Sequence, residues 1–312
     1  MLAYKVTPQE FQQIVTSSDV IYNTTTFCEL NKKKVDYIDY LIVKKDESPR
    51  FAVIFGVKDS QASCPFSAPF GTLLPLKKSS SVENYDDALS AIDIYASDMG
   101  LKKIFFRIPP IFYEVNALTA LVSSLFRHGY EVHDVDVNYA FNLYDVYENY
   151  DSIIHYNAKK NLRIALKSNL ELQICNNEED IISAYNIIAQ NRSCKGYPLR
   201  MTQDQVLETL SVVAHDVFIV QHEGQGIASA IVYHVNDKIA QVIYWGDIPG
   251  VTHLKSINYL AYQLIQYYGA KGCQYLDIGP STENSIPNYG LCDFKESIGC
   301  ERSLKFAMEK CI

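Results

Sequence analysis

The chain has 312 residues, of which 48% are hydrophobic and 21% charged, so it can bury a large core and is long enough for two domains. Its formal net charge of -8 argues against nonspecific binding to DNA, because such binding needs many Lys and Arg side chains against phosphates. It contains no run of about 18 uncharged apolar residues, and its start lacks the basic and apolar segments of a signal peptide. We therefore expect a cytoplasmic protein without a membrane span.

The eight cysteines are scattered, with no CxxC pair and no histidine pair at metal-ligand spacing. We expect reduced thiols and no bound metal.

The first predicted elements are a helix and a hairpin. Thr7-Pro8-Gln9-Glu10 is typical of a helix start, with a Thr cap, a Pro in the first turn and a Glu that can close a capping box. Residues 35–44 and 51–58 are rich in β-forming side chains and are separated by turn formers, which predicts an antiparallel hairpin. A Pro- and Ser-containing loop over 60–75 follows and is long enough to line a cleft.

The rest of the first half alternates between helix and strand. Helical spacing of apolar residues predicts a helix over 83–99, and a buried strand over 104–108 follows it. A second helix over 116–128 stops at Gly129, and a strand over 130–144 closes the half.

The second half repeats this order. A shift of about 170 residues places 104–110 over 274–280, and the preceding helices coincide, so two copies of one α/β unit are expected. The predicted elements of this half are strands over 217–221, 226–235 and 238–245, a helix over 254–268 and a strand over 274–278.

A basic stretch lies between the halves, over 156–170. Lys159, Arg163 and Lys167 recur every four residues, on one stripe of a predicted helix. The stripe is either a solvated helix face or an anion clamp for a phosphate-bearing substrate.

Four short motifs follow in order: Asn191-Arg192, Lys195-Gly196-Tyr197-Pro198, Asp277-Ile278-Gly279 and Gly290-Leu291-Cys292-Asp293-Phe294-Lys295. Their order and spacing resemble the FemABX peptidyltransferases and related tandem acetyltransferase-like proteins. The resemblance implies a mixed α/β fold of two tandem GNAT-like (acyl-CoA N-acyltransferase) domains, at 1–155 and 156–312. It also implies an acyl or aminoacyl donor at the second domain and an amine-bearing sugar or peptide acceptor in a cleft.

The donor loop departs from the usual acetyltransferase pattern. Pro249 to Ser256 retains one glycine, although glycines in this loop let backbone N–H groups approach a pyrophosphate. Gly250, Thr252 and Ser256 are the donor-binding candidates. The loop disfavours acyl-CoA and leaves aminoacyl-tRNA open, although the acidic net charge does not favour a large tRNA footprint.

Lys295 and Asp277 are the catalytic candidates. Lys295 follows Phe294 and could stabilise an oxyanion at the cleft, or it could be a surface lysine paired with Glu296 or Asp293. Asp277 ends a buried strand and could orient the acceptor or accept a proton, or it could cap the turn at Gly279.

The substrate-binding candidates are cations and aromatic residues. Arg192, Lys195 and Arg200 place three cations in a predicted inter-helix loop, which suits a phosphate or carboxylate, or is an ordinary solvated set. The remaining candidates are Lys159, Arg163, Tyr197, Tyr244 and Phe294.

Together these features predict an acyl- or aminoacyl-transferase that acts on an amine of an amino sugar, amino acid or cell-wall peptide precursor. The alternative is a non-catalytic GNAT-fold module that binds a glycan or nucleotide sugar.

Overall fold

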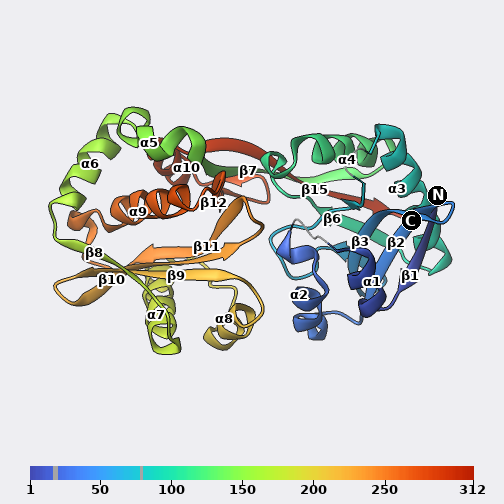
Figure 1. Ribbon diagram of the computed structural model, residues 1–312, viewed down its shortest axis with the longest axis horizontal. Coiled ribbons are helices and arrows are strands. Elements are labelled where there is room, and N and C mark those ends of the chain that lie inside the picture. The colour runs from blue at the N-terminus through green and yellow to red at the C-terminus, as the bar shows by residue number, and fades with distance from the viewer. Residues whose placement is uncertain (17–19, 78–79) are drawn as a thin grey trace. The chain divides into compact units, whose positions relative to one another are not determined.

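The structure is a computed structural model that describes residues 1–16, 20–77 and 80–312 (Figure 1). The chain forms two compact α/β units. Unit 1 comprises Met1–Val137, Thr282–Ile286 and Ser303–Ile312, and unit 2 comprises Asn138–Ser281 and Pro287–Arg302. Within the described ranges, no helix is long and apolar enough to cross a membrane.

Unit 1 is built on a mixed sheet. Strands β1, β2, β3 and β4 pair antiparallel in that order, β6 is parallel to β4, β15 is antiparallel to β6, and the first half of β7 follows β15. The elements are β1 (Leu2–Val6), α1 (Pro8–Ile14), η1 (Ile21–Asn23), α2 (Thr25–Leu30), η2 (Lys32–Lys34), β2 (Tyr37–Lys45), β3 (Ser48–Lys58), β4 (Gln61–Cys64), β5 (Leu74–Pro75), α3 (Val82–Asp98), β6 (Lys103–Arg107), η3 (Ile111–Tyr113), α4 (Val115–Arg127), β7 (Glu131–Asn142), β13 (Thr282–Glu283), β14 (Ile286–Pro287) and β15 (Glu301–Cys311).

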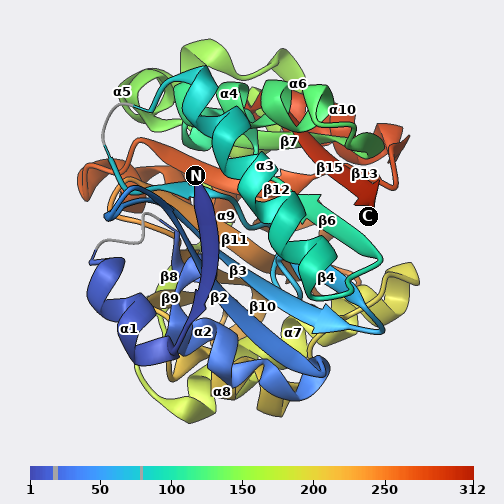
Figure 2. The ribbon, with the colours of Figure 1, turned by 90° about the vertical axis from the view of Figure 1, so that its right-hand side faces the viewer.

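Side chains alternate between the two faces of this sheet along each strand, and helices pack on both faces. Tyr40 packs with Phe11 of α1. On the other face, the Tyr95 hydroxyl of α3 donates to Asp39 at 3.0 Å, and Phe51 packs against Tyr85 of α3. Helices α3 and α4 lie side by side, as Figure 2 shows. The predicted hairpin and the Thr7 capping box are confirmed.

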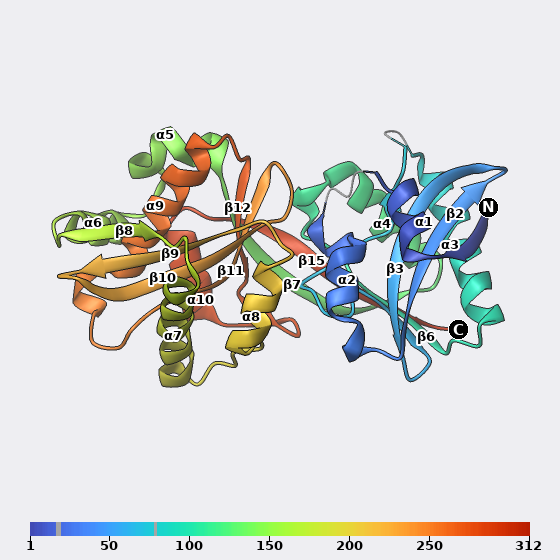
Figure 3. The same ribbon diagram turned by 60° about the horizontal axis from the view of Figure 1, so that its bottom comes forward.

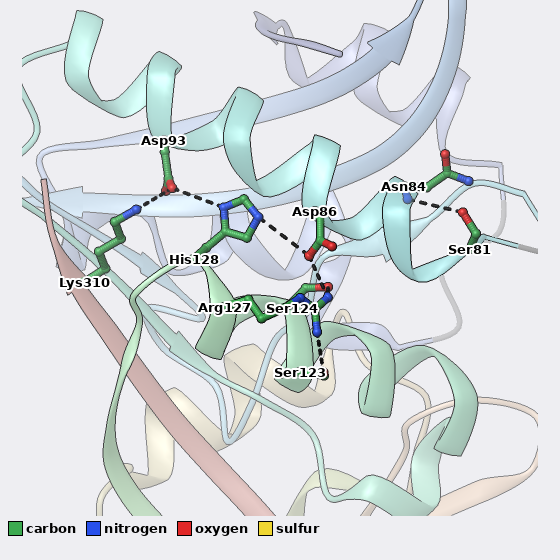
Figure 4. A network of polar contacts seen from close by, with 9 residues as sticks. All are labelled: Ser81, Asn84, Asp86, Asp93, Ser123, Ser124, Arg127, His128 and Lys310. Atoms are coloured by element: carbon green, nitrogen blue, oxygen red, sulfur yellow. Dashed lines mark hydrogen bonds and ion pairs between the residues drawn. The ribbon is translucent and has the colours of Figure 1, made fainter.

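A polar network joins α3, the end of α4 and β15 (Figure 4). His128 lies between two carboxylates of α3, 3.6 Å from Asp86 and 3.9 Å from Asp93. Arg127 binds Asp86 at 2.7 Å, and Lys310 binds Asp93 at 2.6 Å. Ion pairs therefore tie the C-terminal strand to the helical layer of unit 1.

Unit 2 has a sheet of the same kind. Strands β8, β9, β10 and β11 pair antiparallel, β12 is parallel to β11, and the second half of β7 is antiparallel to β12. Its other elements are α5 (Leu143–Ile153), α6 (Tyr156–Leu166), β8 (Leu170–Ile174), α7 (Glu178–Lys195), α8 (Gln203–Leu210), β9 (His215–His222), β10 (Gln225–His234), β11 (Ile239–Asp247), η4 (Thr252–Leu254), α9 (Ser256–Ala270), β12 (Tyr275–Pro280) and α10 (Tyr289–Ser297).

Helices α9 and α7 cover opposite faces of this sheet, as Figures 1 and 3 show. Phe218 of β9 packs against Tyr267 of α9. The next residue, Ile219, faces the other way and lies with Ile187 of α7 around Gly226. Helix α6 packs on α9 and therefore belongs to the α9 side.

The two units share one topology. Strand β4, helix α3 and strand β6 form a parallel βαβ crossover in unit 1, and β11, α9 and β12 form its counterpart in unit 2. The predicted α/β class and the two tandem GNAT-like domains are therefore confirmed.

The unit boundaries lie elsewhere than the expected division at residue 155, because the halves exchange a strand. Strand β7 follows α4 in the first half, yet its residues from Asn138 onward pair with β12 of unit 2. Strand β15 follows α10 in the second half, yet it pairs with β6 of unit 1.

Candidate functional site

The candidate site in unit 2 is a fork where two parallel strands part. Strands β11 and β12 pair from Ile239 with Tyr275 to Gln241 with Asp277, where the parallel pairing ends. The register of β11 against β10 then shifts between Ile231 and Val232, which marks a β-bulge near the point of divergence. We call Val242–Asp247 and Ile278–Pro280 the two arms of the fork.

Asp277 lies at the base of the fork and is fully buried. One carboxylate oxygen accepts from the Asn138 side chain at 2.7 Å and from the Gly279 backbone at 2.8 Å, and the other accepts from Gln241 at 2.9 Å. This carboxylate joins β7, β11 and β12, and its bond to Gly279 is the turn cap that the sequence offered as one alternative.

Lys295 lies in α10 and is only 2% exposed, so it is not the surface lysine that the sequence offered as one alternative. Its ammonium donates to the carbonyl oxygens of Ile278, Gly279 and Pro280 at 2.9, 2.8 and 3.0 Å. An ammonium has three N–H donors, so these bonds use all of them. Burial lowers the pKa of Lys295 to about 8.

Arg192 lies beside the other arm of the fork. Its guanidinium is 5.9 Å from the Tyr197 ring and interacts electrostatically with Tyr244 of β11. Burial lowers the pKa of Arg192. The Arg192 Nε is buried and has no hydrogen-bond partner within the part of the chain that the structure describes. Such a donor is costly to leave unpaired, so it favours an acceptor supplied from outside the chain.

Aromatic side chains line the same arm. Tyr244 is half-buried, and the neighbouring Trp245 packs against Phe294 of α10 with ring centroids 6.5 Å apart. Tyr197 is 42% exposed, and its hydroxyl accepts from the Asn288 side chain at 3.1 Å. The structure thus brings together Arg192, Tyr197 and Tyr244, three of the substrate-binding candidates.

Two of the three predicted loop cations belong to a helix instead. Arg192 and Lys195 lie in the last turn of α7, which ends at the left-handed Gly196. Lys195 and Arg200 are exposed, and Arg200 lies in the segment before α8. The left-handed Gly196 ends the helix, and the two basic side chains in its last turn interact favourably with the carboxyl end of the helix dipole.

The substrate-binding candidates Lys159 and Arg163 do not lie together with Arg192. Lys159 and Arg163 lie on α6, on the α9 side of the sheet, whereas Arg192 lies on α7, on the opposite face. Lys159 also binds Asp151 at 2.5 Å, and Arg163 is exposed to solvent.

The donor loop leads into the start of α9. Gly250 and Thr252 are exposed, whereas Ser256 is fully buried and donates to the Asp247 carboxylate at 2.9 Å. Asn191 of α7 also binds Asp247, at 3.2 Å to the carboxylate and 2.7 Å to the backbone carbonyl. A carboxylate therefore sits at the helix end where a pyrophosphate would need positive potential.

Sequence reasoning missed Asp247, Gln241 and Asn138. An Asp at the end of a strand is typical of a turn, so nothing in the pattern separated Asp247 from ordinary turn formers. The available signal was Gln241, a polar residue between apolar residues of a predicted strand, because a buried polar group must find a partner.

The fold is similar to that of several solved structures. No family model and no curated protein sequence matches the chain. The crystal structure of FemX is similar with a TM-score of 0.72 at 13% identity, over 100% of this chain and 98% of that chain.

Two further structures share the fold. The C-terminal domain of a putative lysylphosphatidylglycerol synthetase from Agrobacterium fabrum has a TM-score of 0.62 at 11% identity, over 97% of this chain and 91% of its own. A tandem GNAT protein from the clavulanic acid biosynthesis pathway has a TM-score of 0.51 at 9% identity, over 88% and 82%. The chain is thus a tandem GNAT-fold protein, and its fold is similar to that of FemX.

Proposed function

We propose that the protein transfers an acyl or aminoacyl group to an amine of an amino sugar, amino acid or cell-wall peptide precursor, at the fork of unit 2. The observation that carries the proposal is the unpaired buried Nε of Arg192 beside the open arm of β11. It supports an anionic group bound there, such as a phosphate of a substrate.

The chemistry needs few reacting protein groups. The acceptor nitrogen attacks the donor carbonyl carbon and forms the new C–N bond, and negative charge collects on the carbonyl oxygen. As the carbonyl re-forms, the bond from carbon to the carrier oxygen or sulfur breaks, and the leaving atom takes up the proton that the nitrogen loses. The buried charge of Lys295 supplies positive potential near this oxygen, although its N–H groups are already bound. We therefore assign Lys295 and Asp277 positioning roles that hold the arms of the fork.

The donor that fits best is an aminoacyl carrier. Asp247 puts negative charge at the start of α9, where it repels a pyrophosphate such as that of acyl-CoA, and Gly250 is the one glycine left in the loop. The name of the Agrobacterium fabrum protein refers to a lysyl group and phosphatidylglycerol, which supports an aminoacyl donor and a precursor or lipid acceptor in this fold.

The second candidate is a non-catalytic module that binds a glycan or nucleotide sugar. The same Asp247 carboxylate favours it. A domain that has lost its transferase activity no longer needs a donor loop that attracts a phosphate-bearing donor. Turnover separates the two candidates, since a binding module takes the ligand without transferring anything to it.

Ligand binding and turnover test the proposal in that order. The first experiment is a thermal-shift screen with nucleotide sugars, amino acids and acyl-CoAs. A compound that binds the folded protein should raise its melting temperature. Arg192→Gln should then weaken a phosphate-bearing ligand by about 10-fold or more in calorimetry, since charge-assisted bonds contribute 1.5–3 kcal/mol in general. The matched control is Arg163→Gln, an exposed arginine on the other face of the sheet. Equal affinities for Arg192→Gln and wild type would remove the basis of the proposed site.

A further inference from the structure

The outward side of α6 has an unusual composition. Ala158, Leu162 and Ala165 form its buried side, which packs against α9. Tyr156, Lys160, Arg163 and Lys167 recur at spacings of four, three and four residues and lie on the opposite, exposed side. Ile164 and Leu166 flank this stripe. We call these six residues the α6 ridge.

The ridge combines positive charge with exposed apolar side chains. Tyr156 is 80% exposed and Leu166 is 52% exposed. The segment from Tyr156 to Lys167 contains no Asp or Glu, although the whole chain has a net charge of -8. The nearby carboxylate of Asp151 is paired with Lys159 at 2.5 Å, so the charge of Lys159 balances its negative charge. The α6 ridge is therefore a local cationic surface on an acidic protein.

The mixture indicates what the ridge binds. Cations on the ridge complement phosphate groups, which both nucleic acids and anionic lipids offer. Aliphatic side chains gain nothing from a nucleic-acid backbone, whereas the acyl boundary of a bilayer takes them out of water. Lys and Arg have long stems that allow their charged ends to reach headgroups while neighbouring apolar groups sit deeper.

We propose that the α6 ridge docks unit 2 on an anionic lipid surface. The contact is peripheral: Lys160, Arg163 and Lys167 meet the headgroups, and Tyr156 and Leu166 reach the interface. It needs no donor or acceptor, so it can be tested whether or not the protein is a transferase.

Vesicle co-sedimentation of the full chain tests the proposal. Wild type should bind vesicles of phosphatidylcholine mixed with phosphatidylglycerol, but not vesicles of phosphatidylcholine alone, and high salt should weaken the binding. Lys160→Gln with Arg163→Gln should weaken binding by about 30-fold, because each charge near an anionic leaflet contributes about 1 kcal/mol. Tyr156→Ser with Leu166→Ser should weaken it several-fold, and both variants should keep the wild-type melting temperature.

Matched controls remove equal charge or apolar surface from unit 1. Lys58→Gln with Lys102→Gln removes two exposed charges, and Val115→Ser with Phe126→Ser removes one aliphatic and one aromatic side chain. Both controls should bind as wild type does. Absence of vesicle binding, or equal losses in the controls, overturns the proposal. Binding of a transfer RNA that depends on the charged ridge residues but not on Tyr156 and Leu166, without vesicle binding, would also overturn it.

Discussion

The ammonium nitrogen of Lys295 lies 2.8 Å from the carbonyl oxygen of Gly279, at the irregular end of β12. Gly279 has a φ of 75°, a conformation that glycine adopts without strain. The same nitrogen binds the carbonyls of Ile278 and Pro280. A buried cation thus satisfies carbonyls on the arm of β12 where the parallel pairing with β11 has ended.

Lys295→Ala should destabilise the protein strongly. The change leaves buried carbonyls without their donor and opens space in the core, so we expect a loss of about 3 kcal/mol in the free energy of unfolding. Urea unfolding measures it, with Lys160→Ala as an exposed control that should stay within about 0.5 kcal/mol. An equally small effect of Lys295→Ala would mean that the three bonds contribute little.

The burial of Lys295 also predicts a pH dependence. Its folded pKa is lowered to about 8, whereas an unfolded lysine titrates near 10.4. Between these values the unfolded state binds more protons, so stability rises with pH across this window. The stability difference between wild type and Lys295→Met should therefore shift in favour of wild type between pH 8 and about pH 10. A difference that is flat over this range would contradict the lowered pKa.

The environment of Asp216 predicts how the stability of the fold changes at acid pH. Burial alone raises the pKa of this carboxyl, but hydrogen bonds from His234 at 2.6 Å and Tyr268 at 2.9 Å, with the charge of Lys271, lower it well below its usual range. Its stabilising contribution is present above the unfolded pKa of about 3.9 and is lost as the pH falls below that value. Asp216→Asn should therefore flatten the acid limb of a stability curve, whereas Asp237→Asn, an exposed control, should not.

Gly246 is required by a close approach of two elements. A Cβ at this position would lie 2.6 Å from Cγ of Asn191, the residue that binds Asp247. Gly246→Ala should cost about 1–3 kcal/mol through overpacking and should loosen the arm of the fork. Gly290→Ala is the matched control, because its Cβ would meet its nearest neighbour at 3.7 Å and alanine favours the helix. Equal melting temperatures for both variants would show that α7 can move away from β11.

Local signals predicted much of the fold. The Thr7 capping box, the helix end at Gly129 and the alternating strands are set by neighbours in the sequence, and the structure contains them. The strand exchange could not be predicted, because no local signal in β7 or β15 says which unit each strand joins, and pairing between distant strands depends on tertiary packing.

The site was predicted less well than the fold. Of the eight substrate-binding candidates, Arg192, Tyr197 and Tyr244 lie near one another, whereas Lys159 and Arg163 lie on the other face of the sheet. Lys295 was expected at a cleft or at the surface, yet it is buried. Lysine is almost never fully buried, and the carbonyls that offset its burial come from an irregular strand end that no local sequence pattern predicts. Asp247 was missed because its partners Asn191 and Ser256 lie far from it in sequence or on another element.

The strand exchange makes a prediction about fragments. Residues 1–155 contain β7 but lack β15, which pairs with β6 from Ala307 with Arg107 to Cys311 with Lys103. Without that strand, the central β6 of unit 1 becomes an exposed sheet edge, and Lys310 no longer binds Asp93. We therefore expect fragment 1–155 to aggregate or to melt without cooperativity, as measured by circular dichroism and size-exclusion chromatography.

A rearranged chain supplies the control for this prediction. Joining residues 301–312 through a flexible linker to the end of fragment 1–137 restores the partner of β6, so this chain should fold and melt cooperatively. A version in which Phe306 and Met308 are replaced by Asp should fail, because Met308 is buried opposite Phe106. If fragment 1–155 alone folds as a monomer with a sharp melting transition, then β7 can take the place of β15 beside β6, and the exchanged arrangement is not needed for the stability of unit 1.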